Sequence, residues 1–203
     1  KNNHKNYLIK INLILVIFIF MAEQTAVAEQ TNDAFQSSVL SEDFIQYMKD
    51  VENRNFSSGP VHESREGGNP TYGFGHKLTN TEKLEGKIYD IPLDEIDEEK
   101  SNTILMKDLK KANDILSKNY GQDYISLDPR RKQMLIDFQY NMGAGGLKKF
   151  KNFRAALFTG NETGMKAEHI RGFYPSQKDR DNKTNFQTLA RNKDFINFFF
   201  PEN

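Results

Sequence analysis

The stretch that decides the fold reads Thr-Tyr-Gly-Phe-Gly-His over residues 71–76, and Glu52 directly follows Val51 upstream of it. Two glycines around one aromatic residue favour a tight turn, because glycine adopts positive φ at little steric cost. The whole region 53–79 is rich in glycine and proline, with short apolar or aromatic pieces between them. This composition predicts turns and short strands that form a small sheet or hairpin.

A helix is predicted before this region. Ser41 is a suitable N-cap, and two acidic residues follow it in the first turn, where the helix dipole favours negative charge. Apolar residues recur at helical spacing at Phe44, Met48 and Val51. Glu52 is therefore expected at the end of this helix, beside its apolar stripe.

The rest of the chain is predicted to be helical. Helical periodicity and capping residues predict helices over 96–120, 128–143, 147–158, 162–170 and 185–199. Strands followed by helices predict an α+β fold, with a small lobe over about 41–95 and a helical lobe over 96–203. A cleft between two lobes is the expected binding site.

The N-terminal segment has the pattern of an export signal. Lys1, Lys5 and Lys10 precede an apolar run over 11–22, and Ala-Val-Ala follows at 26–28. Residues 1–28 are thus predicted to be a signal peptide and 29–40 a linker, so that the domain over 41–203 is secreted or periplasmic. The alternative is an uncleaved membrane anchor, although the apolar run is shorter than the roughly 20 residues of a membrane span.

Composition excludes several classes of function. The 28 basic and 28 acidic residues balance, whereas nucleic-acid-binding proteins normally carry a basic stripe. The chain has no cysteine, which excludes a disulfide scaffold and thiolate chemistry.

Taken together, these motifs resemble the bacteriophage-type lysozymes of glycoside hydrolase family 24. In that family a helix ends in the catalytic glutamate, and Thr-Ile-Gly-Tyr-Gly-His or a near variant follows, matched here by 71–76. The family's long helix is matched at Asp108-Leu109, and its aromatic-Asn-x-Gly stretch at 140–143. The resemblance spans about 41–200 and implies a lysozyme-like fold with a short β-sheet, a long connecting helix and a helical C-terminal lobe.

The resemblance implies that Glu52 is the general acid. Glycosidic cleavage needs a proton on the leaving oxygen, and apolar surroundings keep a carboxylic acid protonated near neutral pH. The second carboxylate is expected at Glu66 or at Glu63, with Thr71 helping to orient a water molecule. Both acids flank Arg65, which stands six residues before Thr71, where the family places its acid.

Four further residues are assigned by the resemblance. His76 is expected to pair with Asp108 of the long helix in a structural role, with general-base catalysis by His76 as the alternative. Tyr140 and Asn141 are expected to line the sugar-binding cleft, although core packing is an equal alternative for Tyr140.

The implied function is hydrolysis of the β-1,4 bond between N-acetylmuramic acid and N-acetylglucosamine in peptidoglycan by a monomer. No cofactor or metal is expected, since the stretch at 62–66 lacks the second histidine of the zinc motif. The alternatives are a peptidoglycan-binding domain without activity, a lytic transglycosylase and a chitinase.

Overall fold

A computed structural model of the chain describes residues 38–53, 61–63, 70–170 and 186–202. The predicted signal peptide and nearly all of the predicted linker lie outside the described residues. Leu40–Asn203 form one compact unit. No helix in the described ranges is long and apolar enough to cross a membrane.

The first described long element is α2 (Glu42–Asn53). The Ser41 hydroxyl accepts a hydrogen bond from the Phe44 backbone N–H at 3.4 Å, as expected of an N-cap. Phe44 and Met48 are fully buried. The predicted helix is confirmed, and Glu52 occupies its last turn.

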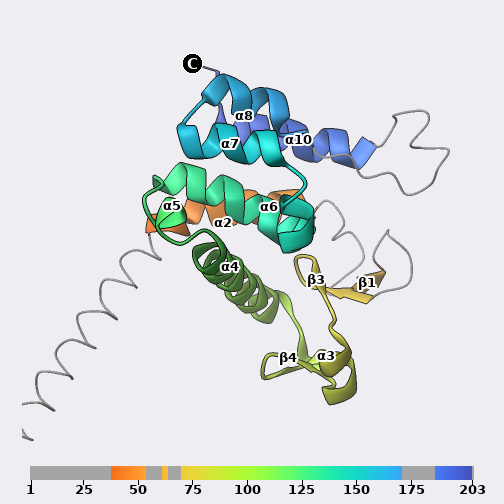
Figure 1. Cartoon of the computed structure of the whole chain (residues 1–203). Helices are drawn as coiled ribbons and strands as arrows, with labels where there is room; N and C mark the ends of the chain where they lie inside the picture. The colour runs from red at the N-terminus through yellow and green to blue at the C-terminus, as the bar shows by residue number, and fades with distance from the viewer. Residues whose placement is uncertain (1–37, 54–60, 64–69, 171–185, 203) are drawn as a thin grey trace, which may run out of the picture. The chain divides into compact units, whose positions relative to one another are not determined.

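Three short antiparallel strands follow, β1 (Val61–Glu63), β2 (Pro70–Tyr72) and β3 (His76–Lys77), in the order β1-β2-β3 (Figure 1). Thr71 on the central strand pairs with His62 on one side and Lys77 on the other. The prediction of short strands in this region is confirmed.

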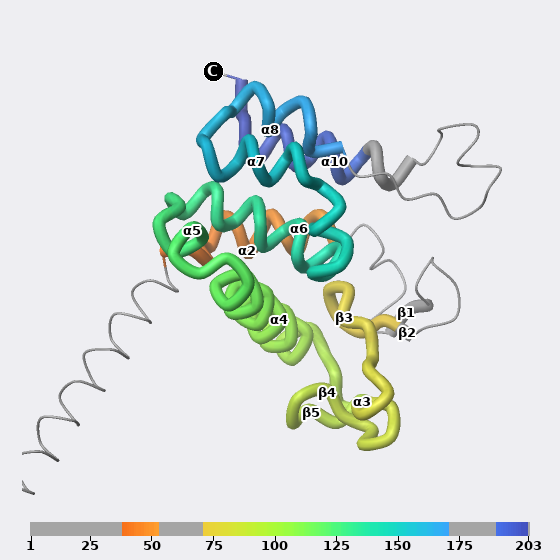
Figure 2. Tube along the Cα trace, viewed as in Figure 1, coloured from red at the N-terminus to blue at the C-terminus, as the bar shows by residue number. Residues whose placement is uncertain are grey.

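Residues 80–95 also form regular structure, although no helix or strand was predicted there from the sequence. The elements are α3 (Asn80–Glu85), β4 (Lys87–Ile88), β5 (Ile91–Pro92) and the 3-10 helix η1 (Leu93–Glu95). Figure 2 shows β4, β5 and α3 together at the start of α4. Ile88, Ile96 and Ile104 make a small core there. Burial of these side chains stabilises elements too short to be stable alone.

The long helix α4 (Glu98–Tyr120) begins two residues later than predicted. Asp97 caps it by accepting from the Lys100 backbone N–H at 2.8 Å, while Ile96 is buried in the small core. Gly121 ends the helix with φ +53, as predicted. The short helix α5 (Gln122–Ile125), which was not predicted, follows at once.

The next helix, α6 (Pro129–Leu147), begins at the predicted cap, where Asp128 accepts from the Arg131 backbone N–H. Gly143 interrupts it with φ +65 and ψ 174, but helical structure resumes to Leu147. The prediction that the helix from Asp128 closes at Gly143 is therefore confirmed, and a short helical segment that was not predicted follows it. The helix predicted to begin at Leu147 begins instead at Lys151, as α7 (Lys151–Thr159), because Leu147 belongs to that short segment.

The last two described helices are α8 (Glu162–Glu168) and α10 (Phe186–Phe199). Phe138 of α6 stacks on Phe153 of α7, with ring centroids 4.3 Å apart, and meets Phe195 of α10 edge-on at 5.6 Å. Tyr47 of α2 stacks on Phe198 of α10 at 4.4 Å. Aromatic packing thus joins α2, α6, α7 and α10. Together, the short strands and these helices confirm the predicted α+β fold, whose larger part is helical.

Candidate active site

Glu52 lies in the last turn of α2, at the edge of the apolar core. Val51, immediately before it, is buried, and the Glu52 side chain is 14 % exposed. The carboxyl group is therefore largely shielded from bulk solvent while it retains access to water.

The glycine turn of the 71–76 stretch contacts the Glu52 carboxyl group. A Cβ atom placed on Gly75, whose φ is +97, would lie 3.0 Å from Glu52 Oε2 and 3.5 Å from Tyr140 Oη. The Tyr140 hydroxyl donates a hydrogen bond to the Phe74 carbonyl oxygen. Figure 1 shows the turn before β3 beside α6. Only glycine combines this backbone conformation with so close an approach to the carboxyl group.

The second partner of Glu52 is Arg191 of α10. Arg191 Nη1 donates to Glu52 Oε1, and Arg191 Nη2 donates to Asp137 Oδ1 of α6 at 2.6 Å. The Arg191 side chain is 12 % exposed and Asp137 is fully buried. One guanidinium group thus bridges two carboxyl groups from two different helices.

Burial alone would lower the pKa of Arg191, but the charges of Glu52 and Asp137 outweigh it and raise that pKa above its ordinary value. Arg191 consequently remains charged at any pH at which the protein is folded. The pKa of Tyr140 is likewise raised, first by burial and then by the charge of Glu52, so that its hydroxyl stays protonated.

Sequence reasoning missed both Arg191 and Asp137. Asp137 stands within the apolar run Met-Leu-Ile-Asp-Phe at 134–138, and an acid buried in such a run requires a partner. That signal could have identified Asp137. Arg191 has no local signal, because it is 139 residues from Glu52 in the sequence.

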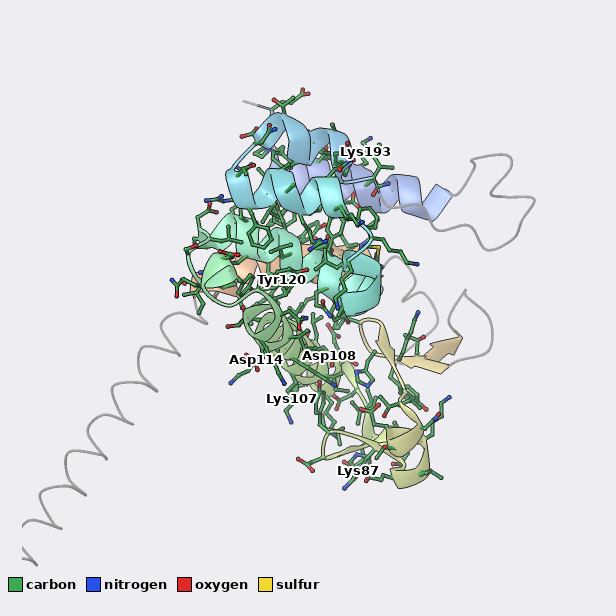
Figure 3. All side chains as sticks on the ribbon, viewed as in Figure 1. Lys87, Lys107, Asp108, Asp114, Tyr120 and Lys193 are labelled. Atoms are coloured by element: carbon green, nitrogen blue, oxygen red, sulfur yellow. The ribbon has the colours of Figure 1, made fainter. Side chains whose placement is uncertain are left out.

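A second charged cluster surrounds His76. His76 Nδ1 lies 2.8 Å from Asp108 Oδ2, and His76 Nε2 lies 3.2 Å from Glu82 Oε1. The Tyr89 hydroxyl donates to Asp108 Oδ1 at 2.6 Å. The structure therefore brings the predicted pair together, with Asp108 on α4 labelled in Figure 3, and adds two partners that were not predicted.

Burial lowers the pKa of His76, but the hydrogen bonds and charges of Asp108 and Glu82 outweigh it, so that the net shift is upward. Burial raises the pKa of Glu82, yet its hydrogen bonds to Thr79 and His76 lower it overall. His76 and Glu82 consequently favour their charged forms together. Both imidazole nitrogens are engaged within the cluster, and this occupancy fits a structural role.

The structure describes little of the two candidates for the second carboxylate. Glu66 lies outside the described residues, and Glu63 is described only by its backbone, at the end of β1 opposite Pro70. Thr71 is buried at 4 % exposure on β2, the strand that leads into the turn at Glu52. The identity of the second carboxylate stays a prediction.

The two predicted sugar contacts differ in environment. Tyr140 is half-buried and Asn141, the next residue of α6, is exposed. The hydrogen bond from Tyr140 to Phe74 fits a role in holding the turn against α6. Contact with a sugar stays a prediction for both residues.

A cavity of about 320 Å³ lies away from these clusters, between the start of α7 and the end of α8. Phe150, Asn152 and Ile170 are among its lining residues, and none of the predicted site residues lines it. Among the described residues no group of three or more histidine, cysteine or acidic side chains could hold a metal ion.

Comparison with known proteins identifies the family. No curated protein matches the chain. The family model described as phage lysozyme matches residues 55–183, which is more than half of the chain. The match includes Thr71, His76, Asp108 and Asp137, whereas Glu52 and Arg191 lie outside it, so their place in the site rests on geometry. The lysozyme-like fold and the match together show that this chain belongs to the phage lysozyme family.

Proposed function

We propose that the protein is an exported muramidase that hydrolyses the β-1,4 bond between N-acetylmuramic acid and N-acetylglucosamine, with Glu52 as its general acid. Membership of the phage lysozyme family supports peptidoglycan as the substrate. The observation that best supports the role of Glu52 is that its shielded carboxyl group lies between the Arg191 guanidinium and the turn at Gly75.

The two oxygens of Glu52 have different tasks in this proposal. Oε1 accepts the hydrogen bond from Arg191 Nη1, which fixes the carboxyl plane. Oε2 faces the turn at Gly75 and carries the proton that passes to the glycosidic oxygen. Proton donation of this kind by a positioned side chain contributes roughly 10²–10⁴-fold to an enzymatic rate.

The reaction is completed on the opposite face of the sugar by Glu66 or Glu63. In an inverting reaction that carboxylate and Thr71 would orient the attacking water, with the two carboxyl groups roughly 6.5–9.5 Å apart; a retaining reaction requires about 5 Å. Product analysis by mass spectrometry and NMR separates these routes from a transglycosylase, because an anhydro sugar end forms only in transglycosylation.

The deciding experiment compares Glu52→Gln with the wild-type protein in the lysis of purified cell walls. Glutamine keeps the size of the side chain but cannot donate the proton, so we expect at least about 100-fold less activity. Asp50→Asn is the matched control, because Asp50 is an exposed acid of the same helix that accepts only from Gln46 in the described structure. Wild-type activity in Glu52→Gln would refute the proposal, and a folded wild-type protein without lysis would indicate a binding domain.

Export is proposed from residues 1–28. Expression of the full chain in a bacterial host, followed by N-terminal sequencing of the protein outside the cytoplasm, tests it. A mature N-terminus at Glu29 supports cleavage after Ala28, and an intact membrane-bound chain supports the uncleaved anchor.

A further inference from the structure

Asp137 is a fully buried carboxyl group in the middle of α6. Its helical neighbours Ile136 and Phe138 are also fully buried. Burial of a carboxylate in such surroundings costs several kcal/mol unless a cation and hydrogen bonds accompany it. Arg191 supplies both through the bond from Nη2 to Asp137 Oδ1.

The bond to Asp137 also determines the orientation of the group that contacts Glu52. Guanidinium is planar and rigid, so fixing one terminal nitrogen fixes the direction of the other. The anchored Nη2 leaves Nη1 directed at Glu52 Oε1. Asp137 therefore holds the guanidinium through Nη2 while Nη1 contacts Glu52.

Charge gives Asp137 a second effect on Glu52. An isolated guanidinium beside Glu52 would favour loss of the proton that a general acid must keep. With Asp137 present, Arg191 is already neutralised, so the cluster is electrically neutral when Glu52 is protonated. Neighbouring groups also act on this cluster: the Tyr47 hydroxyl contributes to the raised pKa of Arg191, and Asp108 and Tyr89 act on the Tyr140 hydroxyl beside Glu52.

We propose that Asp137 is a positioning residue that holds Arg191 against Glu52 and, by its charge, extends the activity of the enzyme to higher pH. The proposal rests on the proposed role of Glu52. Asp137 does not touch substrate, and it acts only through Arg191.

The test is Asp137→Asn in the full chain, assayed with soluble dye-labelled peptidoglycan fragments from pH 4 to pH 9. Loss of the negative charge favours ionised Glu52, so we expect the alkaline limb of the pH–kcat profile to move down by about one pH unit. On the alkaline side of that limb kcat falls by about 10-fold with KM nearly unchanged, and on its acidic side kcat stays close to wild type.

Two further variants separate positioning from folding. Tyr124→Phe removes the buried hydrogen bond to Asn113, 2.6 Å long, without a change of charge, so it should lower stability and leave the alkaline limb in place. Asp137→Glu keeps the charge but moves the carboxyl group by one methylene, so kcat should fall while the alkaline limb of the pH–kcat profile stays in place. If Asp137→Asn does not fold, Asp137→Glu tests the proposal in its place.

Comparison with Glu52→Gln distinguishes failure of the Asp137 proposal from failure of the muramidase proposal. Equal loss at every pH in Asp137→Asn, an unchanged limb in that variant, or a shifted limb in Asp137→Glu would each overturn this inference. If Glu52→Gln is inactive in these cases, the muramidase proposal stands without Asp137. If Glu52→Gln is active, both proposals fail.

Discussion

The cluster around Glu52 and the cluster around His76 are built from similar groups and differ in the cation at their centre. In the first, Arg191 bridges Glu52 and Asp137 across α2, α6 and α10. In the second, His76 bridges Asp108 and Glu82, and Tyr89 donates to Asp108. Each cluster places one cation between two acids.

The two cations differ in how their charge depends on pH. A guanidinium stays charged at all relevant pH values, so the positive charge at the centre of the Arg191 cluster does not depend on pH. Imidazole loses its charge near neutral pH, so the His76 cluster weakens as pH rises. We infer that the first cluster suits proton transfer and that the second serves stability.

The largest expected effect separates the two clusters by activity. Glu52→Gln should lose at least about 100-fold in wall lysis, whereas His76→Gln should keep activity within about threefold at a temperature where the variant is folded. Circular dichroism verifies folding of both. Equal losses of wall lysis in both variants would show that His76 takes part in catalysis and would contradict the difference inferred between the two clusters.

The next effect concerns the turn over 71–76, in which Gly75 lies beside Glu52 and is followed directly by His76. Gly75→Ala would place its Cβ 3.0 Å from Glu52 Oε2, so displacement of the carboxyl group should lower kcat by roughly 10- to 100-fold. Gly86→Ala is the matched control, since Gly86 also has positive φ, at +66, but a Cβ added there would meet no atom within 4 Å. Gly75→Ala should lose more thermal stability than Gly86→Ala, and at a temperature where both are folded kcat should fall only in Gly75→Ala.

A smaller effect concerns stability and its dependence on pH. Asp108→Asn should lower the free energy of unfolding by about 1–3 kcal/mol at pH 6. Because the folded-state pKa of His76 is raised, its contribution is complete below about pH 6.5 and is lost as pH rises through the folded pKa. The loss in Asp108→Asn should therefore be smaller at pH 8.5.

Urea titrations of the wild type and Asp108→Asn at the two pH values measure this difference. The pKa of Glu82 is lowered, so its share is lost only as pH falls below about 4.5 and does not interfere at pH 6. A larger loss at pH 8.5 than at pH 6 would contradict the assignment of His76.

The smallest expected effect is that of Tyr89→Phe, which removes one hydrogen bond to Asp108. The free energy of unfolding should fall by about 0.5–1.5 kcal/mol, measured in urea, with wall lysis unchanged. A loss of activity instead would show that the His76 cluster also controls the geometry at Glu52.

Much of the secondary structure could be predicted from local sequence signals. Ser41 and Asp128 cap the predicted helices, and Gly121 ends the long one, because capping depends on a few adjacent residues. The capping box of Thr79 and Glu82 is a local signal of the same kind, and it marks the start of α3, which was not predicted. The β4–β5 hairpin carried no such signal, since its stability comes from burial of Ile88 against Ile96 and Ile104.

The sequence by itself determined the helix whose last turn holds Glu52, the glycine turn over 71–76 and the α+β class, because each depends on residues close together in the chain. Only the tertiary structure decided which cation reaches Glu52 and which acid holds that cation. Arg191, Asp137 and Glu52 come from three helices far apart in sequence, and their contact depends on how the aromatic core packs α2, α6 and α10 together. Long-range packing of this kind leaves no pattern in the local spacing of residues.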